Sequence, residues 1–192
     1  MNIEEQLFQG KLVCLGPIDH EKDAEIEARW TNDPEYLRLV SVRPAAPRSA
    51  AQVRKRYERI EKEQDEGKDQ YYFTLRMRSD DRLIGYARLF WIEWSNGCGR
   101  VELGIGSPAD RRQGYGSDAL SLLLRYAFHE LNLHRLTAAV PEYNPGAVRL
   151  FEKAGFQQEV RRRQALNRDG RRWDLLHYGL LRSEWQQPGS PK

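Results

Sequence analysis

The sequence is poor in cysteine and has no long apolar run. Its 192 residues include two cysteines, Cys14 and Cys98, which lack metal-site spacing and are too few for a disulfide framework. No apolar stretch approaches the roughly 20 residues of a membrane-spanning helix. The four histidines are scattered, so we expect no metal site. The opening residues, MNIEEQLFQG, lack the basic and then apolar order of a signal peptide. These absences predict a cytoplasmic protein without a metal or a membrane partner.

The chain also lacks an excess of charge of one sign. The 31 basic and 28 acidic residues give a net charge of +3, too close to balance to indicate nucleic acid as a partner. Hydrophobic residues make up 40% and charged residues 31%, as in a globular domain. No repeat, low-complexity tract or linker divides the sequence. We therefore expect one domain over residues 1–192, with a core at about 11–182 and short flexible termini.

Segments typical of strands and helices alternate along the chain. The expected strands cover residues 11–15, 71–77, 82–94, 100–106 and 135–140, followed by a hairpin over 156–181 that turns at an Asp-Gly pair. The expected helices cover residues 19–30, 49–67, about 115–131 and 144–155, with a short helical turn at 31–40. This order predicts an α/β (α+β) domain in which helices flank a mixed sheet of about seven strands.

The stretch DRRQGYGSDAL, residues 110–120, joins an expected strand to an apolar helix. Glycine within a helix costs about 1 kcal/mol relative to alanine, so Gly114 and Gly116 need another explanation. The start of a helix offers unpaired N–H groups and a partial positive charge, which favour a phosphate, and glycines let the backbone approach it. The alternative at this point is a surface turn in which Gly114 only bends the chain.

Two other phosphate-binding motifs fit this region less well. No Gly-Lys-Ser/Thr sequence is present, which excludes the loop that binds nucleoside triphosphates. The stretch GIGSPA, residues 104–109, matches the dinucleotide glycine pattern after a strand. However, Pro108 and the residues after it delay the helix, and the unit lies in the middle of the chain, so this motif is weak.

Arg111, Gly114 and Gly116 form the pattern Arg/Gln-x-x-Gly-x-Gly/Ala, which resembles the coenzyme A pyrophosphate loop of the GNAT superfamily of N-acetyltransferases. The stretch NPGAVRLFEKAGF, residues 144–156, resembles the second signature of that superfamily. Residues 19–40 are similar to the first helices of the branch that acetylates ribosomal-protein alanine, amino acids and polyamines. The resemblance spans residues 11–182. It implies a sheet splayed between its fourth and fifth strands, and acetyl-CoA as cosubstrate.

The resemblance also implies which residues bind this cosubstrate. The pantetheine arm would lie along the fourth strand, the pyrophosphate on the amides at the helix start, and the second signature near the arm. The residues so implied are Leu103, Gly104, Ile105, Arg111, Arg112, Gln113, Gly114, Tyr115, Gly116, Ser117, Asn144 and Phe151. For Asn144 the alternative is an ordinary helix cap, because an Asn-Pro pair is also a common helix start.

Acetyl transfer to an amine needs a base that accepts a proton from the ammonium group. Glu102 matches the acidic position that serves as base in this branch. Its alternative role is a strand carboxylate paired with Arg88 or Arg100. Many relatives have a tyrosine that protonates the leaving thiolate, where this chain has Phe151. The ribosomal branch often has a serine at the position of Ala147. Water or Tyr143 would then supply the proton.

We therefore expect an N-acetyltransferase that moves acetyl from acetyl-CoA to a primary amine by direct attack in a ternary complex. The acceptor would be a protein N-terminus or a small amine, and the chain could pair with a second copy of itself. The missing proton donors leave open a catalytically weak, acetyl-CoA-binding regulatory protein. A third alternative, a nucleic-acid partner for the basic hairpin at residues 161–172, has no RNA-binding motif behind it. Phe90, Trp91 and Trp94 are expected in the core and on the sheet, where one of them could wall the acceptor pocket.

Overall fold

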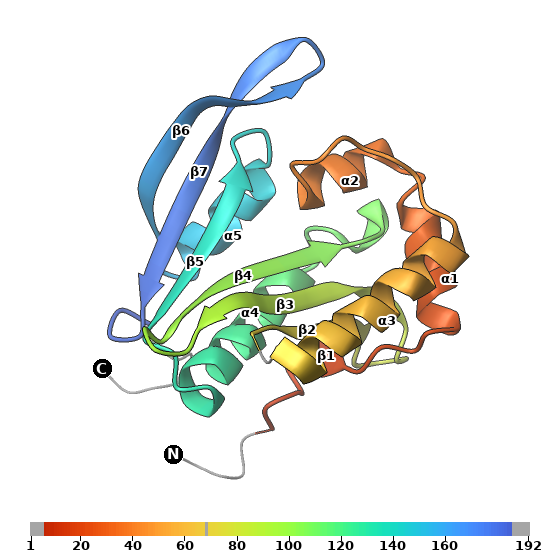
Figure 1. The fold of residues 1–192 in the computed structure, drawn as a ribbon, viewed down its shortest axis with the longest axis horizontal. Coiled ribbons are helices and arrows are strands. Elements are labelled where there is room, and N and C mark those ends of the chain that lie inside the picture. The colour runs from red at the N-terminus through yellow and green to blue at the C-terminus, as the bar shows by residue number, and fades with distance from the viewer. Residues whose placement is uncertain (1–5, 68, 186–192) are drawn as a thin grey trace.

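Seven strands form one mixed sheet in the order β1-β2-β3-β4-β5-β7-β6 (Figure 1). The computed structural model describes residues 6–67 and 69–185. The strands are β1 (Val13–Gly16), β2 (Tyr71–Met77), β3 (Leu83–Glu93), β4 (Cys98–Ile105), β5 (Arg135–Pro141), β6 (Gln157–Arg168) and β7 (Arg171–Leu181). Only β4 and β5 pair in parallel, and the other neighbours are antiparallel. The mixed seven-stranded sheet that the sequence predicts is confirmed.

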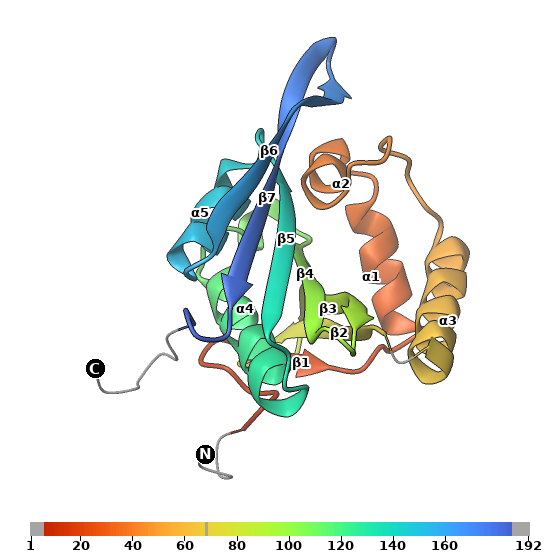
Figure 2. The ribbon, with the colours of Figure 1, turned by 60° about the vertical axis from the view of Figure 1, so that its left-hand side comes forward.

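Helices cover both faces of this sheet, as Figure 2 shows. The helices are α1 (Lys22–Trp30), α2 (Pro34–Val40), α3 (Ala50–Gly67), α4 (Tyr115–Arg125) and α5 (Pro145–Lys153), with short turns η1 (Pro108–Asp110) and η2 (Tyr126–Glu130). Helices α1 and α3 lie on one face, and α4 and α5 on the other. The expected flexible termini, residues 1–10 and 183–192, lie partly outside the described residues, and these domain limits stay a prediction.

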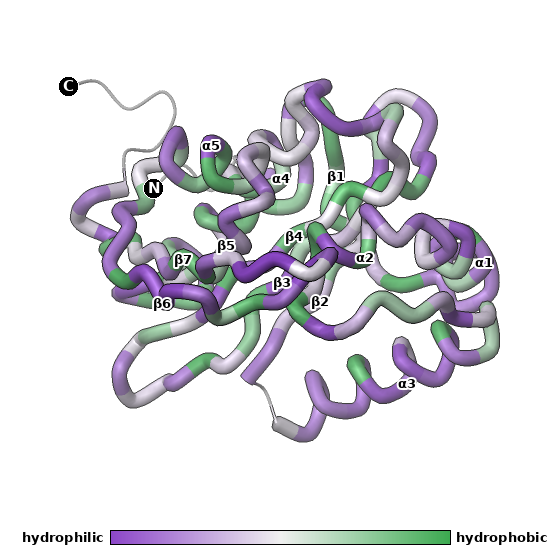
Figure 3. Tube along the Cα trace, turned by 90° about the horizontal axis from the view of Figure 1, so that it is seen from above, coloured by the Kyte–Doolittle hydropathy of each residue, from purple (hydrophilic) through white to green (hydrophobic). Residues whose placement is uncertain are grey.

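Local signals in the sequence explain several of these elements. At the start of α3, Ser49 Oγ accepts the amide of Gln52 (3.3 Å) and Gln52 Oε1 accepts the amide of Ser49 (2.9 Å), which is a capping box. Helix α3 buries only a narrow stripe and is otherwise hydrophilic (Figure 3). The last hairpin turns at Asp169 and Gly170, both with positive φ, as a tight two-residue turn requires.

Two element boundaries differ from the sequence expectation for physical reasons. The first strand begins at residue 13 rather than 11, because the amides of Lys11 and Leu12 donate to the carboxylate of Asp118 in α4. The first helix begins at Lys22 rather than Asp19. The Asp19 carboxylate accepts the amide of Glu21, which precedes the helix, and the amide of Lys22, its first residue. Asp19 therefore stabilises the turn that leads into the helix and is not its first residue.

Two apolar clusters stabilise the sheet from opposite faces. The larger one lies between the sheet and α4, and includes Leu89 and Leu123, both with no exposed surface. The smaller one lies under α1 and α3 and is built around three tyrosines, Tyr57, Tyr72 and Tyr86. The rings of Tyr72 and Tyr86 stack with centroids 5.6 Å apart. The sheet is thus buried on both faces near its centre.

The parallel pairing of β4 with β5 ends early. It covers three residue pairs, from Cys98 with Arg135 to Arg100 with Thr137, after which the strands diverge (Figure 1). By contrast, β3 pairs with β4 as far as Ile105, and β5 pairs with β7 as far as Pro141. The predicted splay between the fourth and fifth strands is confirmed. It leaves the second half of β4 without a β5 partner.

We expect Asp118→Ala to destabilise the fold. The Asp118 carboxylate accepts the amides of Lys11, Leu12 and Val13 at 3.2, 2.7 and 3.0 Å, and so ties β1 to the first turn of α4. Its removal leaves three donors without that acceptor, which should lower the free energy of unfolding in urea by about 1–3 kcal/mol. As a control, Asp65→Ala on the exposed side of α3 should change it by less than about 0.5 kcal/mol. Equal effects of the two changes would contradict this role.

Candidate active site

A cavity of about 580 Å³ opens where β4 and β5 part. Its lining comes from α1, α2, α3 and α5 and from strands β2 to β7. Of the residues predicted for the site, Glu102, Leu103, Asn144 and Phe151 line it. Its volume is in the range of sites for small molecules.

Glu102 of β4 is held by two side chains of β3. Its Oε1 accepts hydrogen bonds from the Tyr86 hydroxyl (2.8 Å) and from Arg88 Nε (3.1 Å), and its Oε2 accepts one from Arg88 Nη2 (2.9 Å). Of the two possible partners, the ion pair therefore forms with Arg88. An ionised carboxylate has about four lone-pair positions, so one stays open toward the cavity. The Glu102 side chain is 29% exposed, which lets a ligand or water reach it.

The protonation states around Glu102 keep it in place. Burial, and then the charge of Glu102, raise the pKa of Tyr86 well above its ordinary value, so this phenol stays protonated and donates. Burial opposes the charge of Arg88, but the nearby Glu102 carboxylate outweighs it and raises the Arg88 pKa. Both neighbours of Glu102 are therefore permanent hydrogen-bond donors.

One face of α5 borders the cavity. Asn144, Ala147 and Phe151 lie at helical spacing on this face, and all three line the cavity. Asn144 is an observed helix cap, because its Oδ1 accepts the amide of Ala147 (3.0 Å), while its Nδ2 donates to the carbonyl of Leu39 (3.3 Å). Its contact with the cosubstrate stays a prediction. Phe151 is 5% exposed and packs edge-on against Phe156.

Tyr143 points toward α2. Its hydroxyl donates to the carbonyl of Arg38 (3.0 Å), and its ring lies edge-on to Trp173, 5.7 Å between centroids. Tyr143 is not among the described residues that line the cavity. Its role as a proton donor stays a prediction, and in this conformation the proton is shared with a peptide carbonyl.

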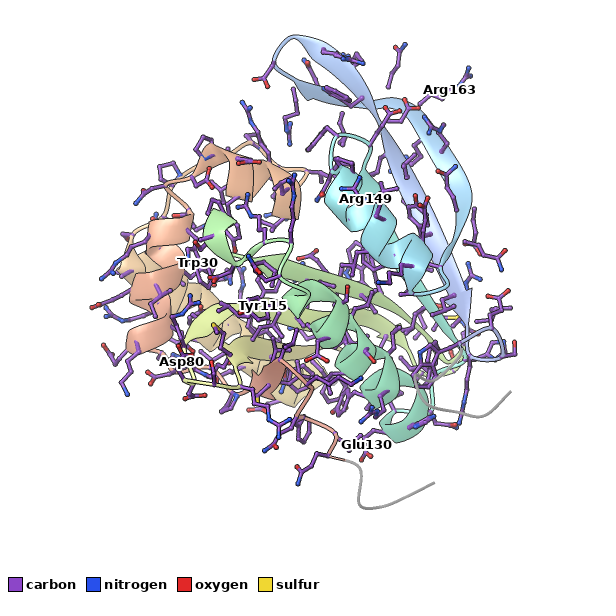
Figure 4. The ribbon with its side chains drawn as sticks, turned by 180° about the vertical axis from the view of Figure 1, so that it is seen from behind. Trp30, Asp80, Tyr115, Glu130, Arg149 and Arg163 are labelled. Carbon is purple, nitrogen blue, oxygen red and sulfur yellow. The ribbon has the colours of Figure 1, made fainter. Side chains whose placement is uncertain are left out.

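The loop before α4 brings the two sequence motifs together. A Cβ atom at Gly116 would lie 3.7 Å from both Leu103 of β4 and Leu150 of α5, so the first turn of α4 sits between the two elements. Figure 4 shows Tyr115 at the start of α4, on the face that also carries α5. Gly114 has φ +89°, which side chains rarely adopt. The first amides of α4 have no partner within the helix, and this loop therefore fits a phosphate.

Two further predicted residues have structural roles. Arg111 turns toward α2, where it forms ion pairs with Asp33 and Glu35 at 3.5 Å, and it donates to the Gly106 carbonyl (3.1 Å). A Cβ atom at Gly104 of β4 would come within 2.8 Å of Val40 of α2. The close packing of α2 on β4 therefore requires a glycine at position 104. The remaining loop residues, Arg112, Gln113 and Ser117, lie in or beside the first turn of α4, and Ile105 ends β4. Cosubstrate contacts of all these residues stay predictions.

Sequence reasoning named Arg100 only as a possible partner of Glu102 and Arg162 only as part of the basic hairpin, and it did not place these side chains or His177 at a binding cavity. Arg100, Arg162 and His177 line it from β4, β6 and β7. A signal was present for Arg100, which precedes Glu102 by two residues and so faces the same side of the strand. Trp91 lines the cavity as an aromatic wall, is 65% exposed, and has a positive φ of 51°, unusual for a bulky residue.

Metal and membrane features are absent from the part of the chain that the structure describes. Within residues 6–67 and 69–185, no group of three or more His, Cys, Asp or Glu side chains could hold a metal ion. In the same ranges, no helix has both the length and the apolar character needed to cross a bilayer.

Comparison with known proteins identifies the class to which this fold and site belong. The family model for the acetyltransferase (GNAT) domain matches residues 13–157. The chain is 41% identical over 105 residues to the probable N-acetyltransferase YjcK of Bacillus subtilis, covering 53% of this chain and 54% of YjcK. It is 30% identical over 140 residues to the uncharacterized prophage-derived N-acetyltransferase YokL of the same organism, covering 73% and 75%. The chain therefore belongs to the GNAT acetyltransferase family.

Solved structures show the same fold. A spermidine N-acetyltransferase from Vibrio cholerae in complex with CoA and spermine aligns with a TM-score of 0.76 at 21% identity, covering 90% of this chain and 96% of that one. A probable acetyltransferase aligns with a TM-score of 0.79 at 24% identity, covering 94% and 97%. Among the sequence relatives, the aligned segments span 54% of YjcK and 65% of YnaD of Bacillus subtilis, less than two thirds of either.

We expect Gly116→Val to weaken CoA binding without unfolding the protein. A side chain at this position makes only ordinary contacts with the protein, at 3.7 Å, but it occupies the space beside the first amides of α4. Calorimetry should show at least about a tenfold loss of CoA affinity, or 1.4 kcal/mol. Gly116→Ala should raise the melting temperature, because alanine favours a helix, while it also weakens CoA binding. Unchanged affinity in the folded Val variant would remove the pyrophosphate assignment. Gly114 suits this test less well, because its positive φ makes any side chain strained.

Proposed function

We propose that this protein is an acetyl-CoA-dependent N-acetyltransferase that acts on a primary amine. The observation that carries the proposal is the position of Glu102, which faces the cavity at the point where β4 leaves β5. Membership of the GNAT family supports the activity. One fold neighbour, the Vibrio cholerae spermidine N-acetyltransferase, was solved in complex with CoA and spermine, which supports a CoA-type cosubstrate and an amine acceptor in this fold.

The chain would hold acetyl-CoA mainly with its backbone. The unpaired edge of β4 at Leu103, Gly104 and Ile105 offers N–H and carbonyl groups to an amide-containing arm, and the amides of residues 112–116 suit the pyrophosphate. When bound, acetyl-CoA supplies an activated acetyl group on a thioester. The backbone would place this group in the gap between the strands, near Glu102.

Glu102 would accept the proton of the ammonium group, directly or through one water. An ammonium nitrogen has no lone pair, so the amine must lose a proton before or as it attacks. The reaction forms one N–C bond and breaks one C–S bond, and the proton that leaves the nitrogen balances the one that the thiolate gains. Tyr86 and Arg88 hold the carboxylate toward the cavity, which supports a fixed distance between base and acceptor.

The alternative is a protein that binds acetyl-CoA and has little activity. The apolar α5 face, with Ala147 and Phe151, favours this alternative because it offers no hydroxyl group there to the thiolate. A thiol-release assay with polyamines, amino acids, aminoglycosides and short peptides separates the two. Release of CoA with at least one amine supports the enzyme, whereas CoA binding without release for any amine supports the regulatory protein.

We expect Glu102→Gln to lower the rate at neutral pH by about 10²–10⁴-fold, the usual contribution of a general base. The affinity for CoA should stay nearly the same, and the loss should shrink at high pH, where more of the amine arrives uncharged. Steady-state rates across pH and calorimetry measure both effects. Glu93, which is exposed at the end of β3, provides the control, and Glu93→Gln should keep the wild-type rate.

Two outcomes would contradict the role of Glu102. A variant that keeps its rate at every pH would make Glu102 a structural partner of Arg88, with catalysis left to proximity. A parallel loss of rate and CoA affinity would mean that the carboxylate only keeps the strand in shape.

We expect Phe151→Tyr to raise the turnover number or to leave it unchanged. Phe151 lines the cavity, so a hydroxyl on its ring could donate a proton to the departing thiolate. The measurement is kcat with a saturating amine, together with the melting temperature. A large loss of kcat in a stable variant would show that the Phe151 ring packs against the substrate and that the proton comes from elsewhere.

A further inference from the structure

The lining of the cavity is strongly basic. Among the described residues, seven arginines and three glutamates line it, which gives this part of the lining a formal charge of +4 with histidine neutral. The arginines are Arg43, Arg48, Arg56, Arg59, Arg88, Arg100 and Arg162, and the glutamates are Glu27, Glu63 and Glu102. The whole chain has a net charge of only +3. The positive charge is thus concentrated in the cavity that Glu102 faces, where the amine would approach this base.

Each of the three glutamates is already neutralised by one arginine. The pairs are Glu27 with Arg56 at 2.8 Å, Glu102 with Arg88 at 2.9 Å, and Glu63 with Arg59 at 3.7 Å. The other four arginines form no ion pair with any described residue. A cationic acceptor would therefore meet four like charges without an ion-pair partner, and each carboxylate of the described lining is already paired.

Arg100 is the best placed of these four. It lies on β4 two residues before Glu102, so both side chains face the same side of the sheet. Its guanidinium lies over the rings of Trp91 and Phe90, 5.1 and 5.7 Å from their centroids. It is half-buried, and burial lowers its pKa by removing stabilisation that water gives the charge, although the charge of Glu102 acts in the opposite direction. An anion beside Arg100 would restore that stabilisation.

His177 of β7 lies near the same point. Its Nε2 is buried without a hydrogen-bond partner in the described part of the chain. Burial, followed by the charges of Arg100 and Arg162, lowers the His177 pKa, so the ring is neutral at pH 7. In the tautomer with the proton on Nε2, this neutral ring has a free donor for an oxyanion.

We propose that the acceptor is a small primary amine that also carries an oxyanion, a carboxylate or a phosphate, and that Arg100, Arg162 and His177 bind this group while the amine faces Glu102. The proposal rests on the proposed function, because it places the amine at the same base. The planar fork of arginine matches both kinds of oxyanion. The site therefore selects against polyamines, although a fold neighbour binds one.

The test measures binding, so that it does not depend on turnover. Two probe sets are titrated into the protein by NMR at pH 7, with and without CoA: amino acids of increasing chain length from glycine to 4-aminobutyrate, and aminoalkyl phosphates. Each amino acid is compared with its carboxamide, which keeps the amine and the size but lacks the charge. Spermidine is the cationic probe. We expect at least one carboxylate or phosphate to bind tenfold or more tightly than its neutral counterpart, and more tightly than spermidine.

Arg100→Gln should lower the affinity for that anionic amine by about 10- to 100-fold and leave the carboxamide unchanged, and Arg100→Lys should restore part of the loss. Arg162→Gln should act in the same direction. Arg163→Gln, the next residue on the hairpin (Figure 4) and not part of the cavity lining, is the matched control and should bind as wild type.

Three results would overturn the proposal. In the first, the carboxamides or spermidine bind no more weakly than every anionic amine, and in the second, the preference for the anion survives Arg100→Gln. In the third, Arg100→Gln lowers the affinity for CoA as much as the affinity for the acceptor. The last result would assign the arginines to the cosubstrate. If anionic amines bind as expected but none is acetylated, the proposed function fails and this inference stands.

Discussion

The early end of the β4–β5 pairing is the constraint on which both parts of the proposed site depend, the backbone that would bind the cosubstrate and the cavity that would bind the acceptor. After Arg100 and Thr137 the strands diverge, and the backbone of β4 from residue 101 onward loses its partner on that side. Unpaired peptide groups in a protein interior need another hydrogen-bond partner. The gap therefore exposes backbone groups that suit the proposed cosubstrate, and Leu103 of β4 both lines the cavity and lies 3.7 Å from a Cβ atom placed at Gly116 of α4.

Helix α2 crosses this gap and is held from both sides. From the β4 side, Arg111 reaches the acidic N-terminus of α2 through Asp33 and Glu35. From the β5 side, Tyr143 and Asn144 donate to carbonyls near its C-terminus. The tip of the last hairpin adds a two-bond ion pair between Arg38 and Asp169, both at 2.9 Å. Arg111 and Asn144, which the sequence motifs assign to the cosubstrate, thus also contact α2, which lines the cavity.

The part of the site that follows from local sequence could be predicted. The loop with Gly114 and Gly116 is contiguous, and the predicted helix start follows it directly; its proposed role in binding depends on the backbone of that helix start, which a short motif specifies. The partner of Glu102 could not be chosen between Arg88 and Arg100, because that choice depends on cross-strand register. The pairing places Arg88 directly opposite Glu102, while a bulge between Phe90 and Glu93 shifts the register at the far end of β3. No local pattern encodes such a register.

The lining of the proposed acceptor cavity is assembled from side chains that lie far apart in the sequence. Arg48 precedes α3, Arg100 is on β4 and Arg162 is on β6, and only the closed fold brings them to one cavity. Relatives with the same fold share recognition by backbone, because such recognition needs only the divergence of β4 from β5 and the start of α4. Recognition by side chains does not, because one arginine in place of a neutral residue changes the charge without changing the fold. A TM-score of 0.76 to a polyamine acetyltransferase at 21% identity therefore shows a shared fold and carries no information on the charge of the acceptor. Four arginines that find no carboxylate among the described residues argue instead for an acceptor of opposite charge.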